Sequence, residues 1–203
     1  MSTPLFIKVC GLRTEQDVDA AVEAGADAIG FVFAASARRI DADSARRLVR
    51  RVPEGVMTVG VFRDQPLAEV RELLDASAVR AVQLHGSEDL AFYDALRPDG
   101  RTLIRGVAVR DDVPPHGERG EDILLLDAPV PGAGETWDRS GKRLPEPGRA
   151  WLLAGGLGPG NVAEAVRLAR PWGVDVSSGI EISRGVKSPE LIAAFIAAAR
   201  AAG

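Results

Sequence analysis

Short apolar runs alternate along the chain with segments whose apolar residues recur at helical spacing. The runs are rich in β-branched residues and bounded by turn-forming residues, which is typical of buried strands. Eight strands are predicted, over residues 5–10, 27–33, 56–62, 79–84, 102–109, 122–127, 150–154 and 174–177. Strands that are apolar on both faces and separated by helices indicate a parallel sheet covered on both sides.

Capping residues predict where the intervening helices begin. Side-chain oxygens and prolines are the preferred residues at helix N-termini. The expected N-caps are Thr14, Asp41 or Asp43, Ser87 and Ser188, and the expected first-turn prolines are Pro66, Pro159 and Pro189. The polar stretch 111–120 predicts a loop or a single turn in place of a helix, and residues 128–141 predict a Gly/Pro-rich loop.

Eight strand–helix units in 203 residues match the lower size limit of a (β/α)8 barrel. No shift in composition marks a boundary, so residues 1–203 are expected to form a single domain of the α/β class. The alternative is a doubly wound open sheet. Such a sheet usually carries a glycine fingerprint after its first strand, where this chain reads Cys10-Gly11-Leu12-Arg13.

Composition narrows the class of protein further. The chain is 46% hydrophobic with a net charge of −4, which is ordinary for a globular protein and unfavourable for binding nucleic acid. Cys10 is the only cysteine, so neither an intramolecular disulfide nor a thiolate metal cluster can form. No apolar run approaches the length of a membrane span, and no signal peptide is evident. We expect a cytoplasmic protein without membrane or nucleic-acid partners.

Polar residues gather where the predicted strands end. Functional groups of a (β/α)8 barrel lie at that end, and strand side chains alternate between the barrel interior and the helices. With the aliphatic positions facing the helices, the interior positions are Lys8 and Cys10, Gln83 and His85, Asp127, and Asp175 and Ser177. An interior without a function would more commonly carry aliphatic residues there.

Each of these residues also has a structural interpretation. Cys10 can be a small buried hydrophobe, Asp127 a loop cap and His85 a turn residue. Lys8 shares a face with Cys10 and would favour the thiolate, so a lowered pKa of Cys10 is expected. The two histidines are 31 positions apart and no metal-binding motif occurs, so no metal site is expected.

Glycine pairs follow the seventh and eighth strands. Barrels of this kind often bind phosphate through backbone N–H groups of these two loops and a short extra helix. The predicted phosphate-binding residues are Gly155, Gly156, Ser178 and Gly179, with an extra turn over residues 179–183. The alternative is a pair of ordinary tight turns.

An ordered set of segments carries a family resemblance. The segments are KVCGL at 8–12, GADAIGFVF at 25–33, VQLHG at 82–86, LLD at 125–127, AGGL at 154–157 with Pro159, Asn161 and Val162, and GVDVSSGIE at 173–181. Together they resemble the phosphoribosylanthranilate isomerase family of tryptophan biosynthesis over nearly the whole chain. The resemblance implies an Amadori rearrangement without metal or cofactor, with Cys10 as general base and Asp127 as general acid.

The resemblance also implies a substrate-binding set. Members of the family usually carry an arginine for the anthranilate carboxylate in the loop after the second strand. Here it aligns with Arg38 if that loop is one residue shorter, and with Arg39 if it is not. Gln83, His85 and Asp175 are the further residues expected to contact the small-molecule substrate.

The loop after the sixth strand departs from the family pattern, because residues 132–138 read GAGETWD where a Gly-Gly-Ser/Thr-Gly run is usual. Two alternatives therefore stay open: another phosphate-binding barrel, such as an aldose–ketose isomerase or epimerase, and a catalytically inactive phosphate binder. The sequence does not fix the oligomeric state.

Overall fold

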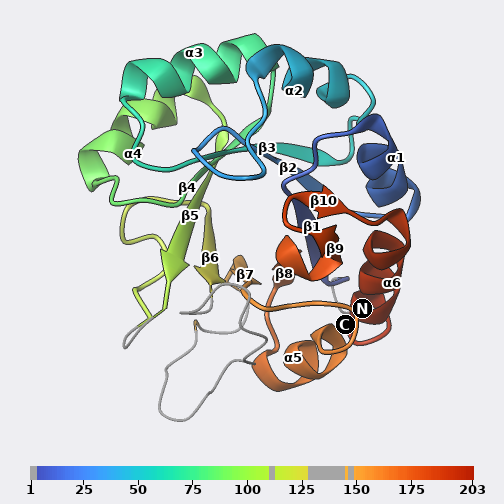
Figure 1. Ribbon diagram of the computed structural model, residues 1–203. Helices are drawn as coiled ribbons and strands as arrows, with labels where there is room; N and C mark the ends of the chain where they lie inside the picture. Colours follow the sequence, from blue (N-terminus) through green and yellow to red (C-terminus); the bar gives the residue numbers. More distant parts are fainter. Residues whose placement is uncertain (1–3, 110–112, 128–144, 146–148) are drawn as a thin grey trace.

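Eight parallel strands close into a barrel in chain order (Figure 1). The computed structural model describes residues 4–109, 113–127, 145 and 149–203. The strands are β1 (Phe6–Cys10), β2 (Ala28–Val32), β3 (Met57–Phe62), β4 (Ala81–Leu84), β5 (Thr102–Ala108), β6 (Ile123–Asp127), β7 (Trp151–Leu153) and β8 (Gly173–Val176). Because β1 pairs with β8, the predicted barrel is confirmed and the open sheet is excluded.

Helices surround the strands. The described α-helices are α1 (Glu15–Glu23), α2 (Ala42–Val49), α3 (Leu67–Ser77), α4 (Leu90–Leu96), α5 (Val162–Ala169) and α6 (Pro189–Arg200). Short 3-10 turns, η1 (Arg97–Asp99) and η2 (Ser178–Ile180), follow α4 and β8. A small hairpin of β9 (Glu181–Ser183) and β10 (Val186–Lys187) stands between η2 and α6, where only an extra turn was predicted.

Three of the predicted N-caps are confirmed. The side chains of Thr14, Asp41 and Ser188 each accept a hydrogen bond from a backbone N–H in the first turn of α1, α2 and α6. Asp41 rather than Asp43 is therefore the cap of α2. Pro189 occupies the first turn of α6 as predicted.

The predicted starts of three other helices are wrong. Asp89, not Ser87, caps α4, because both the hydroxyl and the backbone N–H of Ser87 donate to Asp64 instead. Pro66 occupies the N-cap position of α3 rather than its first turn. Pro159 lies in a turn before α5, which the Asn161 side chain closes by hydrogen bonds to the backbone on either side of Leu157.

Residues 113–121 form turns between β5 and β6, as predicted for the described part of that stretch. Arg105 of β5 faces outward into the space that a helix would cover, and its Nη1 donates to Glu118 at 2.7 Å. His116 lies 3.0 Å from the carbonyl oxygen of Ala150 and links the turns to the start of β7. The loop predicted at residues 128–141 lies outside the described residues.

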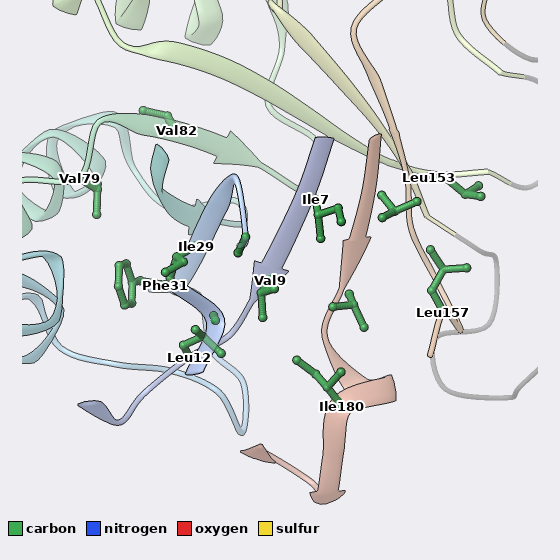
Figure 2. Packing of buried hydrophobic residues seen from close by; sticks show 14 of the residues in the cluster. Ile7, Val9, Leu12, Ile29, Phe31, Val79, Val82, Leu153, Leu157 and Ile180 are labelled. Carbon is green, nitrogen blue, oxygen red and sulfur yellow. The ribbon is translucent and has the colours of Figure 1, made fainter. Parts of the chain in front are cut away.

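Two apolar layers build the core. The outer layer lies between strands and helices and includes Ile7, Val9, Leu153 and Ile180 (Figure 2). The inner layer fills the barrel with alternate strand residues: Cys10, Ala28, Val32, Val59, Val61, Ala81, Ile104, Ile123, Leu125, Leu152 and Ala154. The predicted alternation is therefore confirmed, and the same interior face carries the buried polar residues Lys8, Gln83 and Asp175. Within the described ranges, none of the helices is long and apolar enough to cross a membrane.

Candidate active site

The strand ends place the predicted catalytic groups around one opening. Cys10 is the last residue of β1, Asp127 is the last residue of β6, and His85 follows β4 directly. Cys10 packs so closely on Gly30 of β2 that a Cβ at Gly30 would lie 2.7 Å from Sγ. A thiol and a carboxylate thus approach the barrel axis from well-separated strands.

A buried ion pair lies beneath the thiol. Lys8 Nζ donates to Asp175 Oδ1 at 2.8 Å, and the lysine side chain is fully buried. Burial by itself lowers the pKa of Lys8, but Asp175 and Cys10 raise it above its usual value. Lys8 is therefore an ammonium ion paired with a carboxylate. The predicted contact of Asp175 with substrate stays a prediction.

The pKa of Cys10 is raised, contrary to the expected lowering. Burial disfavours the thiolate, and the carboxylate of Asp175 adds to this effect. Lys8 and Lys187 lower the pKa, but they do not offset the burial. The cations near Cys10 thus moderate a rise in pKa rather than producing a thiolate at neutral pH.

Asp127 lies beside His85, with Oδ2 3.5 Å from His85 Nε2. On the other side of the ring, Gln83 Nε2 lies 3.2 Å from His85 Nδ1. Burial lowers the pKa of His85, so the imidazole is neutral at pH 7. Gln83 is buried below His85, and its Oε1 has no hydrogen-bond partner among the residues that the structure describes. Its predicted contact with substrate stays a prediction.

Arg38 lies at the mouth, against the residue that follows Cys10. A Cβ at Gly11 would meet Arg38 Cδ at 2.8 Å, so the arginine stem crosses the backbone directly after Cys10. The guanidinium binds Glu181 through two hydrogen bonds, from Nε at 2.6 Å and from Nη2 at 3.0 Å. Arg39 is exposed. This geometry favours Arg38 as the arginine nearest the thiol.

The loops after β7 and β8 meet at the predicted phosphate-binding residues. A Cβ at Gly179 would lie 1.9 Å from the carbonyl oxygen of Leu157, so only glycine allows this approach. Gly155 and Gly156 both have positive φ, at 87° and 62°, which favours glycine. Within the described segments, no hydrogen bond from the backbone N–H groups of Gly155, Gly156, Ser178 and Gly179 occurs. These four donors remain available to an anion.

The arrangement has the parts needed for acid–base chemistry on an anionic substrate. A thiol and a carboxylate flank the opening, an arginine lies beside the thiol, and N–H groups without a partner in the described part of the chain border the mouth at β7 and β8. Among the residues described, no group of three His, Cys, Asp or Glu is placed to hold a metal ion.

Comparison with known proteins supports the same chemistry. The family model for N-(5'-phosphoribosyl)anthranilate (PRA) isomerase matches residues 7–198. The chain belongs to the PRA isomerase family. It is 44% identical to the isomerase of Thiobacillus denitrificans, over 96% of this chain and 98% of that protein. It is 40% identical to the isomerase of Symbiobacterium thermophilum, over 97% of this chain and 98% of that protein.

Solved structures of PRA isomerases share the fold. The Thermus thermophilus enzyme superposes with a TM-score of 0.84 at 34% identity, covering 96% of this chain and 98% of that one. Another phosphoribosyl anthranilate isomerase, in complex with reduced 1-(o-carboxyphenylamino)-1-deoxyribulose 5-phosphate, superposes with a TM-score of 0.79 at 31% identity over 97% of this chain and 99% of that one. The chain is therefore an isomerase with a (β/α)8 barrel, as predicted.

Sequence reasoning missed two charged residues at the site. Glu181 binds Arg38, and Lys187 Nζ binds Glu181 at 2.9 Å. Glu181 belongs to the segment 173–181 that carried the resemblance, but nothing in its spacing predicts a bond to a residue 143 positions earlier. Lys187 precedes the N-cap of α6 and would ordinarily be interpreted as a solvated residue.

Proposed function

We propose that this chain converts N-(5'-phosphoribosyl)anthranilate to 1-(2-carboxyphenylamino)-1-deoxyribulose 5-phosphate in L-tryptophan biosynthesis, with Cys10 as general base and Asp127 as general acid. The observation that carries these roles is the placement of the thiol and the carboxylate at the ends of β1 and β6, on well-separated sides of one barrel mouth. Membership of the PRA isomerase family supports the reaction.

Ring opening requires a proton on the furanose oxygen. Asp127 in its protonated form would donate that proton, the C1′–O bond would break, and the anthranilate nitrogen would form a Schiff base with C1′. His85 lies within 3.5 Å of the Asp127 carboxylate and is neutral, so it can accept or return a proton there.

Isomerisation requires removal of the C2′ proton. The thiolate of Cys10 would take this proton, and the resulting enolamine would tautomerise to the ketone. The raised pKa of Cys10 makes the thiolate scarce at pH 7 but a strong base once formed. Lys8, Lys187 and the Schiff base cation would all stabilise the thiolate in the complex.

Both ends of the substrate are anionic and require hydrogen-bond donors from the site. The aromatic carboxylate would bind Arg38, whose side-chain stem crosses Gly11 next to Cys10. The phosphate would bind the N–H groups of Gly155, Gly156, Ser178 and Gly179. Gln83 and Asp175 are buried against His85 and Lys8, and the partly buried His85 would be the member of this set nearest the substrate.

Turnover distinguishes this function from an inactive binder. Phosphoribosylanthranilate made in place from anthranilate and phosphoribosyl pyrophosphate should lose its fluorescence faster with the protein than without it. The ketose product should form in equal amount. Loss at only the spontaneous rate would leave a phosphate-binding barrel.

Cys10→Ala and Asp127→Asn should each lower kcat by about 10²- to 10⁴-fold, because each removes one proton-transfer group. The far-UV circular dichroism of both variants should match that of the parent protein. Asp43→Asn, which removes a carboxylate on the exposed face of α2, serves as the matched control and should keep the parent kcat. Turnover near the parent rate in either active-site variant contradicts its role.

We also infer that the protein acts in the cytoplasm and as a single domain. The biosynthetic reaction of this family uses a phosphorylated small molecule, and this supports the cytoplasm as the place of action. Residues 1–203 would act as one domain, because the ladder of β1 to β8 runs through the whole described barrel.

A further inference from the structure

Arg38 is held by a carboxylate that the proposed reaction does not use. Glu181 accepts from Arg38 Nε and Nη2, from Lys187 Nζ and from the backbone N–H of Gly185. Burial by itself raises the pKa of Glu181, but these donors lower it to about 2. The carboxylate is thus fully ionised at neutral pH and surrounded by donors.

Lys187 fixes Glu181 to the end of β8. Its side chain is 1% exposed, and its Nζ donates to the carbonyl oxygen of Ser177 at 2.7 Å, to the Ser177 hydroxyl at 3.2 Å and to Glu181 at 2.9 Å. Three acceptors satisfy the three protons of an ammonium group. Ser177 directly precedes the predicted phosphate-binding residues, so one hydrogen-bonded chain connects that loop to Arg38.

The hairpin that carries these residues packs against the loop that carries Arg38. A Cβ at Gly185 would lie 2.7 Å from the carbonyl oxygen of Ala37, so the hairpin turn and the loop after β2 are in direct contact. Arg13 Nη2 also donates to the carbonyl oxygen of Gly185 at 2.5 Å and holds the hairpin turn. The position of Glu181 is therefore fixed by the backbone as well as by its ion pairs.

Arg38, Glu181 and Lys187 form a trio of charged residues whose net charge also affects ligand binding. Arg38 and Glu181 neutralise one another, and Lys187 leaves the group with one net positive charge. The bonds to Glu181 use Nε and Nη2 of Arg38 and leave Nη1 outside the pair. An arginine that is already fixed loses little side-chain entropy when a ligand binds.

From this geometry we propose that Glu181, held by Lys187, is a positioning residue that fixes Arg38 for the aromatic carboxylate of the substrate and makes the site selective for it. The single net positive charge of the trio complements one ligand carboxylate. Hydrogen bonds to Ser177, beside the phosphate loop, fix the position of that charge. The inference rests on the proposed function and identifies which chemical group of the substrate this part of the site recognises.

The test compares two ligands. One is reduced 1-(o-carboxyphenylamino)-1-deoxyribulose 5-phosphate, and the other is the same compound with a phenyl group in place of the carboxyphenyl group. The ratio of their dissociation constants isolates the carboxylate and can be measured by calorimetry. In the parent protein we expect the carboxylate to strengthen binding about 100-fold, as for a charge-assisted pair with arginine.

Glu181→Gln should lower this ratio about 10-fold, because the amide can accept only one of the two guanidinium bonds and releases Arg38. This loss of fixed geometry outweighs the positive charge that the substitution adds. Lys187→Met should lower it by a similar factor, because the trio loses its net positive charge. Arg38→Met should bring the ratio of dissociation constants to about 1, so that the carboxylate no longer strengthens binding. The double variant Arg38→Met/Glu181→Gln should have the same ratio as Arg38→Met. Binding of the phenyl compound should stay within about 2-fold of the parent value for the variants of Arg38 and Glu181. Lys187→Met is judged by the ratio alone, because Lys187 also binds Ser177 beside the phosphate loop.

Two controls match the charge changes. Glu72→Gln removes a carboxylate on the exposed face of α3, and Arg184→Met removes a cation from the exposed turn of the same hairpin. Both should keep the parent ratio. An equal loss of affinity for both ligands in Glu181→Gln would show a merely structural role and overturn the proposal. An unchanged ratio would overturn it too.

Failure of the proposed function has a different signature. A parent protein that binds neither compound would refute phosphoribosylanthranilate isomerisation and this inference together. A parent protein that binds both, with Glu181→Gln and Lys187→Met retaining its ratio, would refute the positioning role alone.

Discussion

Gly30 allows the thiol of Cys10 to lie against the neighbouring strand. Its missing side chain leaves the space that Sγ fills, since an added Cβ would lie 2.7 Å from Sγ and 3.2 Å from the α-carbon of Cys10. Because the backbone of Cys10 is also this close, movement of its side chain alone cannot relieve the clash. Glycine is therefore required here by close approach to Cys10, the proposed general base.

Gly30→Ala should lower kcat by about 100-fold while the barrel still folds. The added methyl group pushes the thiol away from its place, and displacement of a catalytic group by about 1 Å costs a rate factor of this order. Steady-state kinetics should show the loss, and thiol reactivity with a disulfide reagent should change with it. Gly55→Ala, where an added Cβ meets nothing within 4 Å, is the control. Equal kcat in the two variants would contradict the requirement.

The limits of sequence reasoning are clearest at single residues. Strand alternation was sufficient to place Lys8, Cys10, Gln83 and Asp175 inside the barrel, because it depends only on local backbone geometry. The direction of the Cys10 pKa was wrong, because it depends on how deeply the thiol is buried, and burial is a property of the whole packed barrel.

At the scale of elements, the strands were predictable and the helix starts were less so. Apolar runs in a barrel are buried on both faces, so each of the eight strands has a strong signal. A helix start depends on one side chain, and loops compete for the same residues. Ser87 has the right chemistry for an N-cap, but Asp64 of the neighbouring loop binds it instead.

The connection between β5 and β6 illustrates how an element can be replaced. In place of a helix, the turns of residues 113–121 cover β5, and Arg105 anchors them. The arginine side chain is 10% exposed and Glu118 is 50% exposed, so the cation is the buried partner. Loss of the carboxylate leaves a mostly buried charge without its main partner.

Glu118→Gln should therefore lower the free energy of unfolding by about 1 kcal/mol, as measured by urea denaturation. Arg105→Met should lower it less, because a methionine fills the same space without a charge to compensate. Glu72→Gln on α3 is the control for loss of an exposed carboxylate. A smaller effect for Glu118→Gln than for Arg105→Met would show that the arginine stem, not the ion pair, anchors the turns. Neither substitution should alter KM.

Closure of the barrel joins the two ends of the described chain. Figure 1 shows α6 beside α1, on the side of the barrel that carries β1. Arg200 at the end of α6 donates to the carbonyl oxygens of Leu5 and Gly25 and to Asp27 Oδ2, the last at 2.7 Å. The same carboxylate oxygen accepts from the backbone N–H of Ile7 at 2.7 Å. One side chain thus connects the last helix to β1 and to the residues before β2.

This closure predicts one unfolding unit. Each described strand of the barrel pairs on both sides, so there is no edge at which part of the sheet can separate without exposing backbone groups. Far-UV circular dichroism, which reports on the helices, and tryptophan fluorescence should show the same transition in urea. Of the three tryptophans, Trp151 in β7 and Trp172 just before β8 report on that side of the barrel, and Trp137 lies outside the described residues. Two separated transitions would contradict a single domain over residues 1–203.

Arg200→Met tests whether the contacts between α6 and the start of the barrel are lost in the same unfolding transition as the rest of the barrel. The substitution leaves the Asp27 carboxylate and two carbonyl groups without the guanidinium, and we expect the free energy of unfolding to fall by about 2 kcal/mol. Because the barrel unfolds as one unit, both optical signals should shift to lower urea by the same amount, with an unchanged slope. Arg46→Met, at an exposed position of α2, is the control and should leave the midpoint in place. A shift confined to the circular dichroism would mean that α6 detaches alone, since only a helix that leaves before the strands can change one signal without the other.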